Sequence, residues 1–71
     1  PPYRLGCVPD ALARILDAGC VAPGCLLVCE SGEPEIFGGN ADLAARFEVV
    51  KAARYSITYI TILRLLPEAS R

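Results

Sequence analysis

An α/β chain with one amphipathic helix, one buried strand and a C-terminal antiparallel β-hairpin is the fold class that this sequence predicts. Three observations predict it. Apolar residues recur at helical spacing over 8–18, an apolar run at 25–29 follows a Pro-Gly turn, and two apolar segments at 47–54 and 57–66 are joined by a tight turn. A helix, a short turn and an apolar strand form the second half of a βαβ unit, which favours a mainly parallel sheet.

The helix is predicted from Val8 to Ala18, and its apolar residues lie at positions i, i+3 and i+4. These residues are Leu12, Ile15 and Leu16. Gly19 follows the last turn, as expected for a helix end. The charged residues of this segment are predicted to be solvated helix charges, not catalytic groups. They are Asp10, Arg14 and Asp17.

The run from Cys25 to Cys29 is apolar at every position, so we expect a strand that is buried on both faces. The next segment, 33–40, has turn residues at both ends and predicts a surface loop. Its Gly38-Gly39 pair lacks the motif context of a phosphate-binding loop and is interpreted as a simple turn. Residues 41–46 predict a short helix with Asn40 as its N-cap.

The two C-terminal apolar segments predict a hairpin with its turn at Tyr55-Ser56. The segment 57–66 is apolar on both faces, so it is expected to be central in the sheet, and Pro67 ends it. The segment 47–54 is expected at or near the sheet edge, because charged residues commonly protect exposed edges. Its charged residues are Glu48, Lys51 and Arg54.

Size and composition limit the functional classes. The chain has 71 residues, 54% of them hydrophobic, with a mean hydropathy of +0.41. This is unusually apolar for so short a domain, and we expect some of the apolar surface to contact further protein. The net charge is −1, so a nucleic-acid surface must be local. No apolar run reaches the length of a membrane span, which favours a cytoplasmic protein without membrane partners.

Cysteine accounts for four residues, at 7, 20, 25 and 29, and their spacing favours reduced, buried thiols. In a strand, Cys25 and Cys29 would lie about 13 Å apart, too far for a disulfide. Other disulfides and a four-thiolate metal site are the alternatives, although the chain lacks both His and a Cys-x-x-Cys pair.

Pro1-Pro2-Tyr3 resembles the end of the (Asp/Asn)-Pro-Pro-(Tyr/Phe) motif, without its first residue. In order and spacing, four segments resemble the bacterial small-subunit ribosomal RNA guanine-N2 methyltransferases. They are Pro-Pro-Tyr-Arg-Leu-Gly (1–6), Ala-Gly-Cys-Val-Ala-Pro-Gly (18–24), Leu-Leu-Val-Cys-Glu (26–30) and Ala-Arg-Tyr-Ser-Ile-Thr-Tyr-Ile-Thr-Ile-Leu-Arg (53–64). The resemblance covers the whole chain. The family often has Tyr-Gly-Asp-Thr in the final hairpin, whereas this chain has Tyr-Ser-Ile-Thr at 55–58.

The resemblance implies the second half of a class I, Rossmann-like methyltransferase fold, in which an antiparallel strand is inserted between two parallel ones. Residues 1–71 would then be the C-terminal part of a single domain, and the cofactor-binding N-terminal half would lie outside the chain. That half would bind S-adenosylmethionine, and the 71 residues alone would be inactive. The partner would be ribosomal RNA or a small-subunit assembly intermediate.

The resemblance also implies roles for the first three residues. An Asp or Asn side chain before Pro1, together with the Pro1 carbonyl, would accept hydrogen bonds from the exocyclic amine of the target base. Pro2 would stiffen the loop, and Tyr3 would stack on a guanine taken out of its RNA stack. Alternatively, this tripeptide is a polyproline-like terminal segment, or Tyr3 is an ordinary core aromatic.

Further candidate residues carry charge. Arg4, Lys51 and Arg54 are candidates for contacts with RNA phosphates, with solvated surface charges as the alternative. Glu30 ends the apolar strand at its carboxyl end, where open α/β sheets bind ligands, and a solvated strand end is the alternative. Thr58 and Thr61 are interpreted as strand-forming residues and not as nucleophiles.

Two other functions fit the same sequence. A related methyltransferase would act on adenine N6 in DNA or on a protein amide, since similar Pro-Pro-Tyr motifs serve those reactions. A non-catalytic α/β interaction module would use its exposed apolar face to dock a partner.

Overall fold

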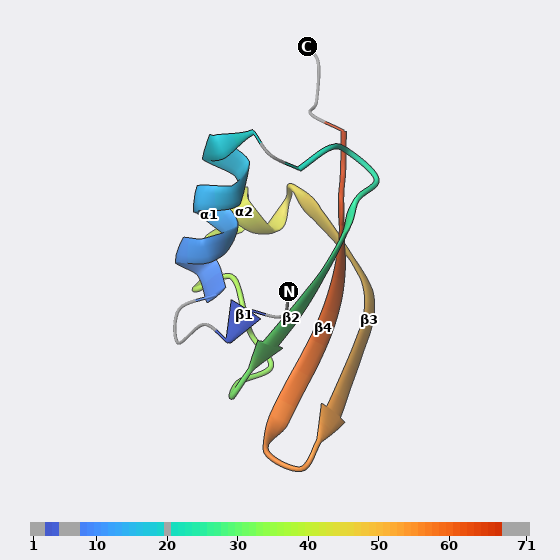
Figure 1. The fold of residues 1–71 in the computed structure, drawn as a ribbon. Coiled ribbons are helices and arrows are strands. Elements are labelled where there is room, and N and C mark those ends of the chain that lie inside the picture. Colours follow the sequence, from blue (N-terminus) through green and yellow to red (C-terminus); the bar gives the residue numbers. More distant parts are fainter. Residues whose placement is uncertain (1–2, 5–7, 20, 68–71) are drawn as a thin grey trace.

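The computed structural model describes residues 3–4, 8–19 and 21–67, which form a small α/β unit (Figure 1). Two helices and four strands follow one another along the chain. In order, they are β1 (Tyr3–Arg4), α1 (Val8–Ala18), β2 (Leu26–Ser31), α2 (Ala41–Ala44), β3 (Phe47–Tyr55) and β4 (Thr58–Leu65).

The strands form one sheet in the order β1-β2-β4-β3. β1 and β2 are parallel, and β4 runs antiparallel to both of its neighbours, β2 and β3. The last strand in the sequence is therefore inserted next to the edge and separates β2 from β3. The prediction of a central second hairpin strand and an edge first strand is confirmed.

Helix α1 has the predicted bounds, from Val8 to Ala18. Leu12 is buried, and Leu16 packs against the core beside it. Asp10, Arg14 and Asp17 are all exposed, as predicted. An amphipathic stripe thus directs one side of the helix to the sheet and leaves the charged side in solvent.

Helix α2 is short, from Ala41 to Ala44, and its predicted N-cap is confirmed. The Asn40 side-chain oxygen accepts a hydrogen bond from the Leu43 amide at 3.0 Å. This bond pairs one of the amide groups that a helix start leaves without a partner. The cap directs Leu43 into the core, where it is 6% exposed.

The loop between β2 and α2 is more than a surface connection. Ile36 is only 3% exposed and belongs to the core, and the Phe37 ring stacks on Phe47 with centroids 6.2 Å apart. The Glu35 carboxylate accepts hydrogen bonds from the Phe37 and Gly38 amides at 2.8 and 2.9 Å, and these bonds fix the loop where it turns inward. The predicted turn at Gly38-Gly39 is confirmed, and both glycines have positive φ.

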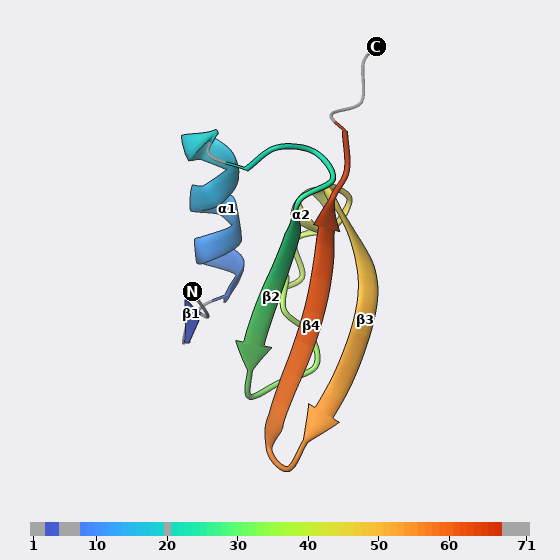
Figure 2. The same ribbon diagram turned by 45° about the vertical axis from the view of Figure 1, so that its right-hand side comes forward.

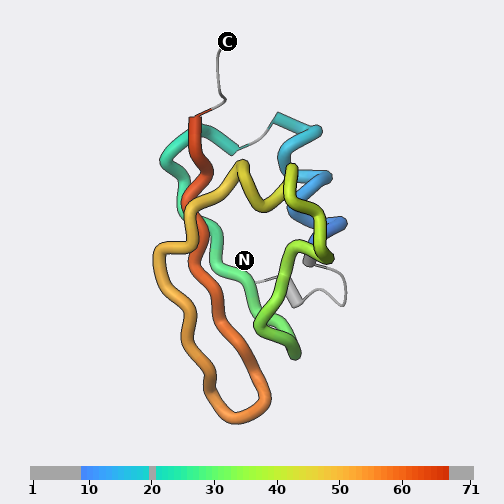
Figure 3. The backbone as a smooth tube through the Cα atoms, turned by 180° about the vertical axis from the view of Figure 1, so that it is seen from behind, coloured from blue at the N-terminus to red at the C-terminus, as the bar shows by residue number. Residues whose placement is uncertain are grey.

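One face of the sheet carries the hydrophobic core, and α1, α2 and the loop lie on that same side (Figure 1, Figure 3). The core unites residues from both helices, from the loop and from three strands. Its buried members are Leu12, Cys29, Ile36, Leu43, Phe47, Leu63 and Leu65. We call this side of the sheet the covered face.

The opposite side, the open face, has no helix over it in the part of the chain described (Figure 2). Leu26 and Val28 of β2 are 53% and 52% exposed, while Ile60 and Ile62 of β4 are half-buried. The prediction that the 25–29 run is buried on both faces is therefore wrong. Helices α1 and α2 both lie on one side of the sheet, so alternate residues of β2 remain in solvent on the other side.

The hairpin of β3 and β4 has a two-residue turn at Ser56 and Ile57, one residue later than predicted, because Tyr55 pairs with Thr58. Ser56 has a φ of 59°, and a positive φ at the first turn position is typical of a type II′ turn. A register shift between Val49 and Lys51 marks a β-bulge in the edge strand. Bulges and charges together make an edge strand a poor template for further pairing.

Candidate functional site

Four predicted site residues, Tyr3, Arg4, Glu30 and Arg54, lie toward the carboxyl end of the sheet. β1 and β2 are parallel and end there, and the β3–β4 turn lies at the same end, at the bottom of Figure 1. Arg4 pairs with Glu30, Glu30 pairs with Ile60, and Ile60 pairs with Ala53, so one row crosses all four strands. Open α/β sheets bind ligands outside the carboxyl ends of their strands.

Tyr3 and Arg4 form the outer strand of this row. Their backbone pairs in parallel with Cys29 and Glu30 of β2. Pro1 and Pro2, the other two residues with predicted catalytic roles, lie outside the described residues. The position of Tyr3 at the carboxyl end agrees with a role beside a ligand, while the role itself stays a prediction.

Glu30 lies near the carboxyl end of β2 and is half-buried. The register puts it in the same row as Ile60, two residues along from the Val28–Ile62 pair, so it belongs to the open face. Of the acidic residues on the strands, it is the one beside β1. Its predicted alternatives, a site residue or a solvated strand end, both stay open.

Arg54 lies at the other side of the same end and is held in place. Its Nε donates a hydrogen bond to the Ser56 carbonyl at 2.8 Å, and its guanidinium carbon lies 5.7 Å from the centre of the Tyr59 ring. Arg54 and Tyr59 are directly opposite each other on the two hairpin strands. Cation–π attraction operates within about 6 Å of a ring centre. A turn carbonyl and a ring therefore orient this cation.

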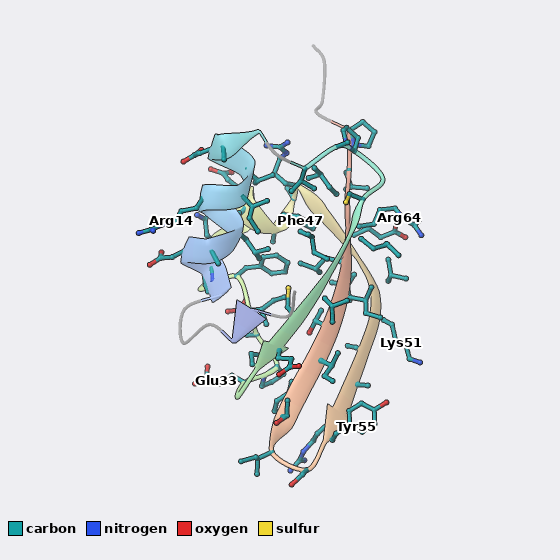
Figure 4. The ribbon with its side chains drawn as sticks, in the orientation of Figure 1. Arg14, Glu33, Phe47, Lys51, Tyr55 and Arg64 are labelled. Atoms are coloured by element: carbon teal, nitrogen blue, oxygen red, sulfur yellow. The ribbon has the colours of Figure 1, made fainter. Side chains whose placement is uncertain are left out.

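Lys51 and Arg54 do not come together, although both are predicted phosphate contacts. Lys51 pairs with Ile62 and Arg54 pairs with Tyr59, three residues away along β4. Because side chains alternate between faces, Lys51 lies on the open face and Arg54 on the covered face. Figure 4 shows the Lys51 side chain extending away from β3 into solvent. One run of phosphates along a single face would not meet both cations.

Sequence reasoning did not single out Tyr59 or Ser56. Both partners of Arg54 follow from the hairpin register, and the two-residue turn at 56–57 fixes that register. Placing the turn one residue too early shifts the pairing and hides the Arg54–Tyr59 contact. The signal was present as Arg-Tyr-Ser-Ile-Thr-Tyr over 54–59, in which Arg and Tyr flank a possible two-residue turn.

The thiols add no site among the residues described. Cys25 and Cys29 are both free, and Cys7 and Cys20 lie outside the described residues. Cys29 is buried as predicted, whereas Cys25 is exposed, which corrects the prediction for that residue. Desolvation by burial raises the pKa of the Cys29 thiol, so this group is uncharged at neutral pH. Within the described ranges, no three potential metal-ligating side chains cluster together.

Two further observations bear on the kind of protein that carries this site. The helices of residues 3–4, 8–19 and 21–67 are all too short or too polar to span a bilayer. Neither a protein-family model, nor a curated protein, nor a solved structure matches the chain. Support for a function therefore comes from the sequence motifs and from the geometry of the carboxyl end.

Proposed function

We propose that this chain is the substrate-side half of a methyltransferase that transfers a methyl group from S-adenosylmethionine to the exocyclic N2 amine of a guanine in small-subunit ribosomal RNA. The observation that carries the proposal is the strand order. β4 lies antiparallel between β2 and β3, beside a parallel β1–β2 pair, which is the arrangement expected for the end of a class I methyltransferase sheet. Tyr3, the last residue of Pro-Pro-Tyr, lies in β1 beside the carboxyl end of β2, where open α/β sheets bind ligands, and this position supports the proposed substrate-side role.

The proposed chemistry needs orientation more than acid–base strength. The amine lone pair attacks the sulfonium methyl carbon, the carbon–sulfur bond breaks, and its electrons stay on sulfur as a thioether. The methylated amine then releases one proton to water. Hydrogen-bond acceptors hold the amine so that its lone pair faces the methyl group, and this orientation lowers the barrier. The Pro1 carbonyl and a preceding Asp or Asn are the proposed acceptors, and Tyr3 is the proposed stacking partner of the base.

The cofactor is proposed to bind mainly to a separate N-terminal half. The 71 residues contain no Gly-x-Gly-x-x-Gly sequence, and Gly38-Gly39 forms a turn against α1. The chain alone is therefore proposed to be inactive. A cytoplasmic location and a ribosomal RNA partner follow from the same proposal.

The test begins with the native polypeptide that carries this chain, captured by an antibody to the β3–β4 hairpin. Its intact mass and the residue preceding Pro1 are measured first, and we expect an Asp or Asn there. The polypeptide is then incubated with methyl-labelled S-adenosylmethionine and, separately, with small-subunit RNA, DNA and protein. We expect label in RNA as N2-methylguanosine by nucleoside mass spectrometry.

Other outcomes redirect the proposal. Label in DNA adenine or in a protein amide would replace the substrate and keep the reaction class. No transfer to any substrate, with tight S-adenosylmethionine binding absent, would overturn the enzyme proposal. Methyl transfer by the 71 residues alone would overturn the division into two halves.

A non-catalytic interaction module is the second candidate, and the open face favours it. Leu26 and Val28 are more than half exposed on one face of the same strand, and exposed apolar patches commonly mark contact surfaces. This candidate requires that the 71 residues unfold cooperatively by themselves. Cooperative two-state unfolding together with no methyl transfer by the native polypeptide would favour the module.

A further inference from the structure

We propose that the hairpin tip, residues 54–59, binds single-stranded RNA next to the target nucleotide, by stacking an unpaired base on the Arg54 guanidinium. The identity of the RNA rests on the proposed function, whereas the binding itself does not. The chain has a net charge of −1, yet residues 54–59 contain one Arg, two Tyr and no acidic residue. The tip is thus a local cationic and aromatic element on an otherwise slightly acidic chain.

Arg54 is already in an orientation that suits stacking. Its Nε donates a hydrogen bond to the Ser56 carbonyl, and the Tyr59 ring lies against the guanidinium on one side. The four remaining guanidinium hydrogens, on the two Nη atoms, make no hydrogen bond within the described residues, and the side chain is exposed. Bases of single-stranded RNA stack on aromatic rings and on Arg planes, and such an Arg can also donate to an adjacent phosphate. Holding the side chain beforehand reduces the entropy lost on binding.

Two further tip residues carry exposed apolar or aromatic side chains. Tyr55 is 61% exposed and Ile57 in the turn is 79% exposed. Figure 4 shows Tyr55 at the far end of the hairpin. Both side chains are available to contact a base or ribose of a bound strand.

The tip is also correctly placed to meet RNA that flanks the target. It lies at the same end of the sheet as Tyr3, with β4 and β2 in between. Three strand spacings correspond to roughly 14 Å between the backbones of β1 and β3. A base held at Tyr3 and a base stacked on Arg54 are therefore different nucleotides. The tip would recognise the strand beside the methylated guanine.

The test is the affinity of the full chain for a fluorescent, unstructured RNA 12-mer, read by anisotropy without cofactor. Arg54→Lys keeps the charge and removes the planar group, and Tyr59→Leu removes the ring that supports it. We expect each to weaken binding by about 10-fold, the size of one lost stacking contact. Tyr59→Phe keeps the ring and should bind as the wild type does. Arg14→Gln is the matched control, because it removes an exposed cation from α1, outside the hairpin, and we expect a change below about 2-fold.

RNA binding by Arg54→Lys and Tyr59→Leu equal to that of the wild type would overturn the proposal. Equal losses from Arg54→Gln and Arg14→Gln, with no loss from Arg54→Lys, would also overturn it, because charge alone would then explain the binding. Circular dichroism of each variant checks folding. If a variant does not fold, photocrosslinking of 4-thiouridine RNA to the wild-type chain decides, and crosslinks outside residues 54–59 would contradict the proposal. A tip that binds RNA on a protein that transfers no methyl group would overturn only the proposed function.

Discussion

The covered and open faces of the sheet are built from the same strands and both carry apolar residues, yet their surroundings differ. On β4, Leu63 is fully buried, whereas its neighbour Ile62, on the other face, is only half-buried. On β2, Cys29 is buried and Val28 is 52% exposed. The apolar pattern therefore determines which residues are able to form a core, while the number of helices that cover the sheet determines which of these residues become buried.

The largest expected effect separates the two faces directly. Leu63→Ala removes a fully buried side chain at the centre of the core and should lower the free energy of unfolding by about 3 kcal/mol or more. Ile62→Ala, one residue away on the open face, should cost about 1 kcal/mol because part of its side chain is already in solvent. Urea unfolding of both variants provides the measurement. Equal losses would mean that another surface covers the open face in solution.

A second comparison concerns the loop that completes the covered face. At Gly38, with φ of 63°, an added Cβ would lie 3.1 Å from the Pro9 Cγ in α1. At Gly39, with φ of 75°, it would meet no atom within 4 Å. Both Gly→Ala changes carry the cost of a positive φ, about 1 kcal/mol. Gly38→Ala should cost about 1 kcal/mol more, since the loop must move away from the helix.

Thermal unfolding of the two variants measures this difference, and Gly39→Ala is the control for backbone strain. A Gly38→Ala protein as stable as Gly39→Ala would show that the loop does not pack closely on α1. The covered face would then depend on the helices alone.

These local features were predictable from sequence to different degrees. Helix α1, the Asn40 cap and the order of the hairpin strands follow from short-range patterns, and all three predictions are confirmed. The burial of Ile36 was not predictable, because no period marks a loop residue whose partners are distant in sequence. The exposure of Leu26 was missed for a related reason, since an apolar strand does not reveal what covers it.

The candidate site was predictable only in part. The location of Glu30 at a carboxyl strand end followed from the position of the apolar run. The pairing of Arg54 with Tyr59 required the hairpin register, and an error of one residue in the turn concealed it. Lys51 and Arg54 are three residues apart in a regular part of β3, so strand alternation alone puts them on opposite faces, independently of the β-bulge between Val49 and Lys51.

Alkaline pH offers a third way to compare buried and exposed groups. Burial raises the pKa of the Cys29 thiol. The native state therefore keeps its proton at a pH where the unfolded chain has lost it, and stability falls as the pH rises from the ordinary thiol pKa through the raised native value. Below that pH window the thiol is protonated in both states, and its titration causes no loss of stability. Cys29→Ala should remove this part of the alkaline loss in a urea titration against pH.

Thiol labelling supplies the matching control. Exposed Cys25 should react with a thiol reagent much faster than buried Cys29, by a factor that reflects how often the sheet opens. Equal labelling rates at neutral pH would contradict a closed covered face. An unchanged alkaline profile in Cys29→Ala would assign the loss to other groups.

The smallest expected effect belongs to the ion pair at the border of the open face. Arg64 Nη1 and Glu48 Oε1 lie 3.1 Å apart, with side chains 45% and 51% exposed. Solvent screens such a pair, so Glu48→Gln should change the free energy of unfolding by about 0.5 kcal/mol or less. A double-mutant cycle with Arg64→Gln, repeated in 1 M NaCl, isolates the coupling. A coupling well above 1 kcal/mol that persists in salt would mean that the pair is desolvated, and hence that the open face is covered by another protein surface in solution.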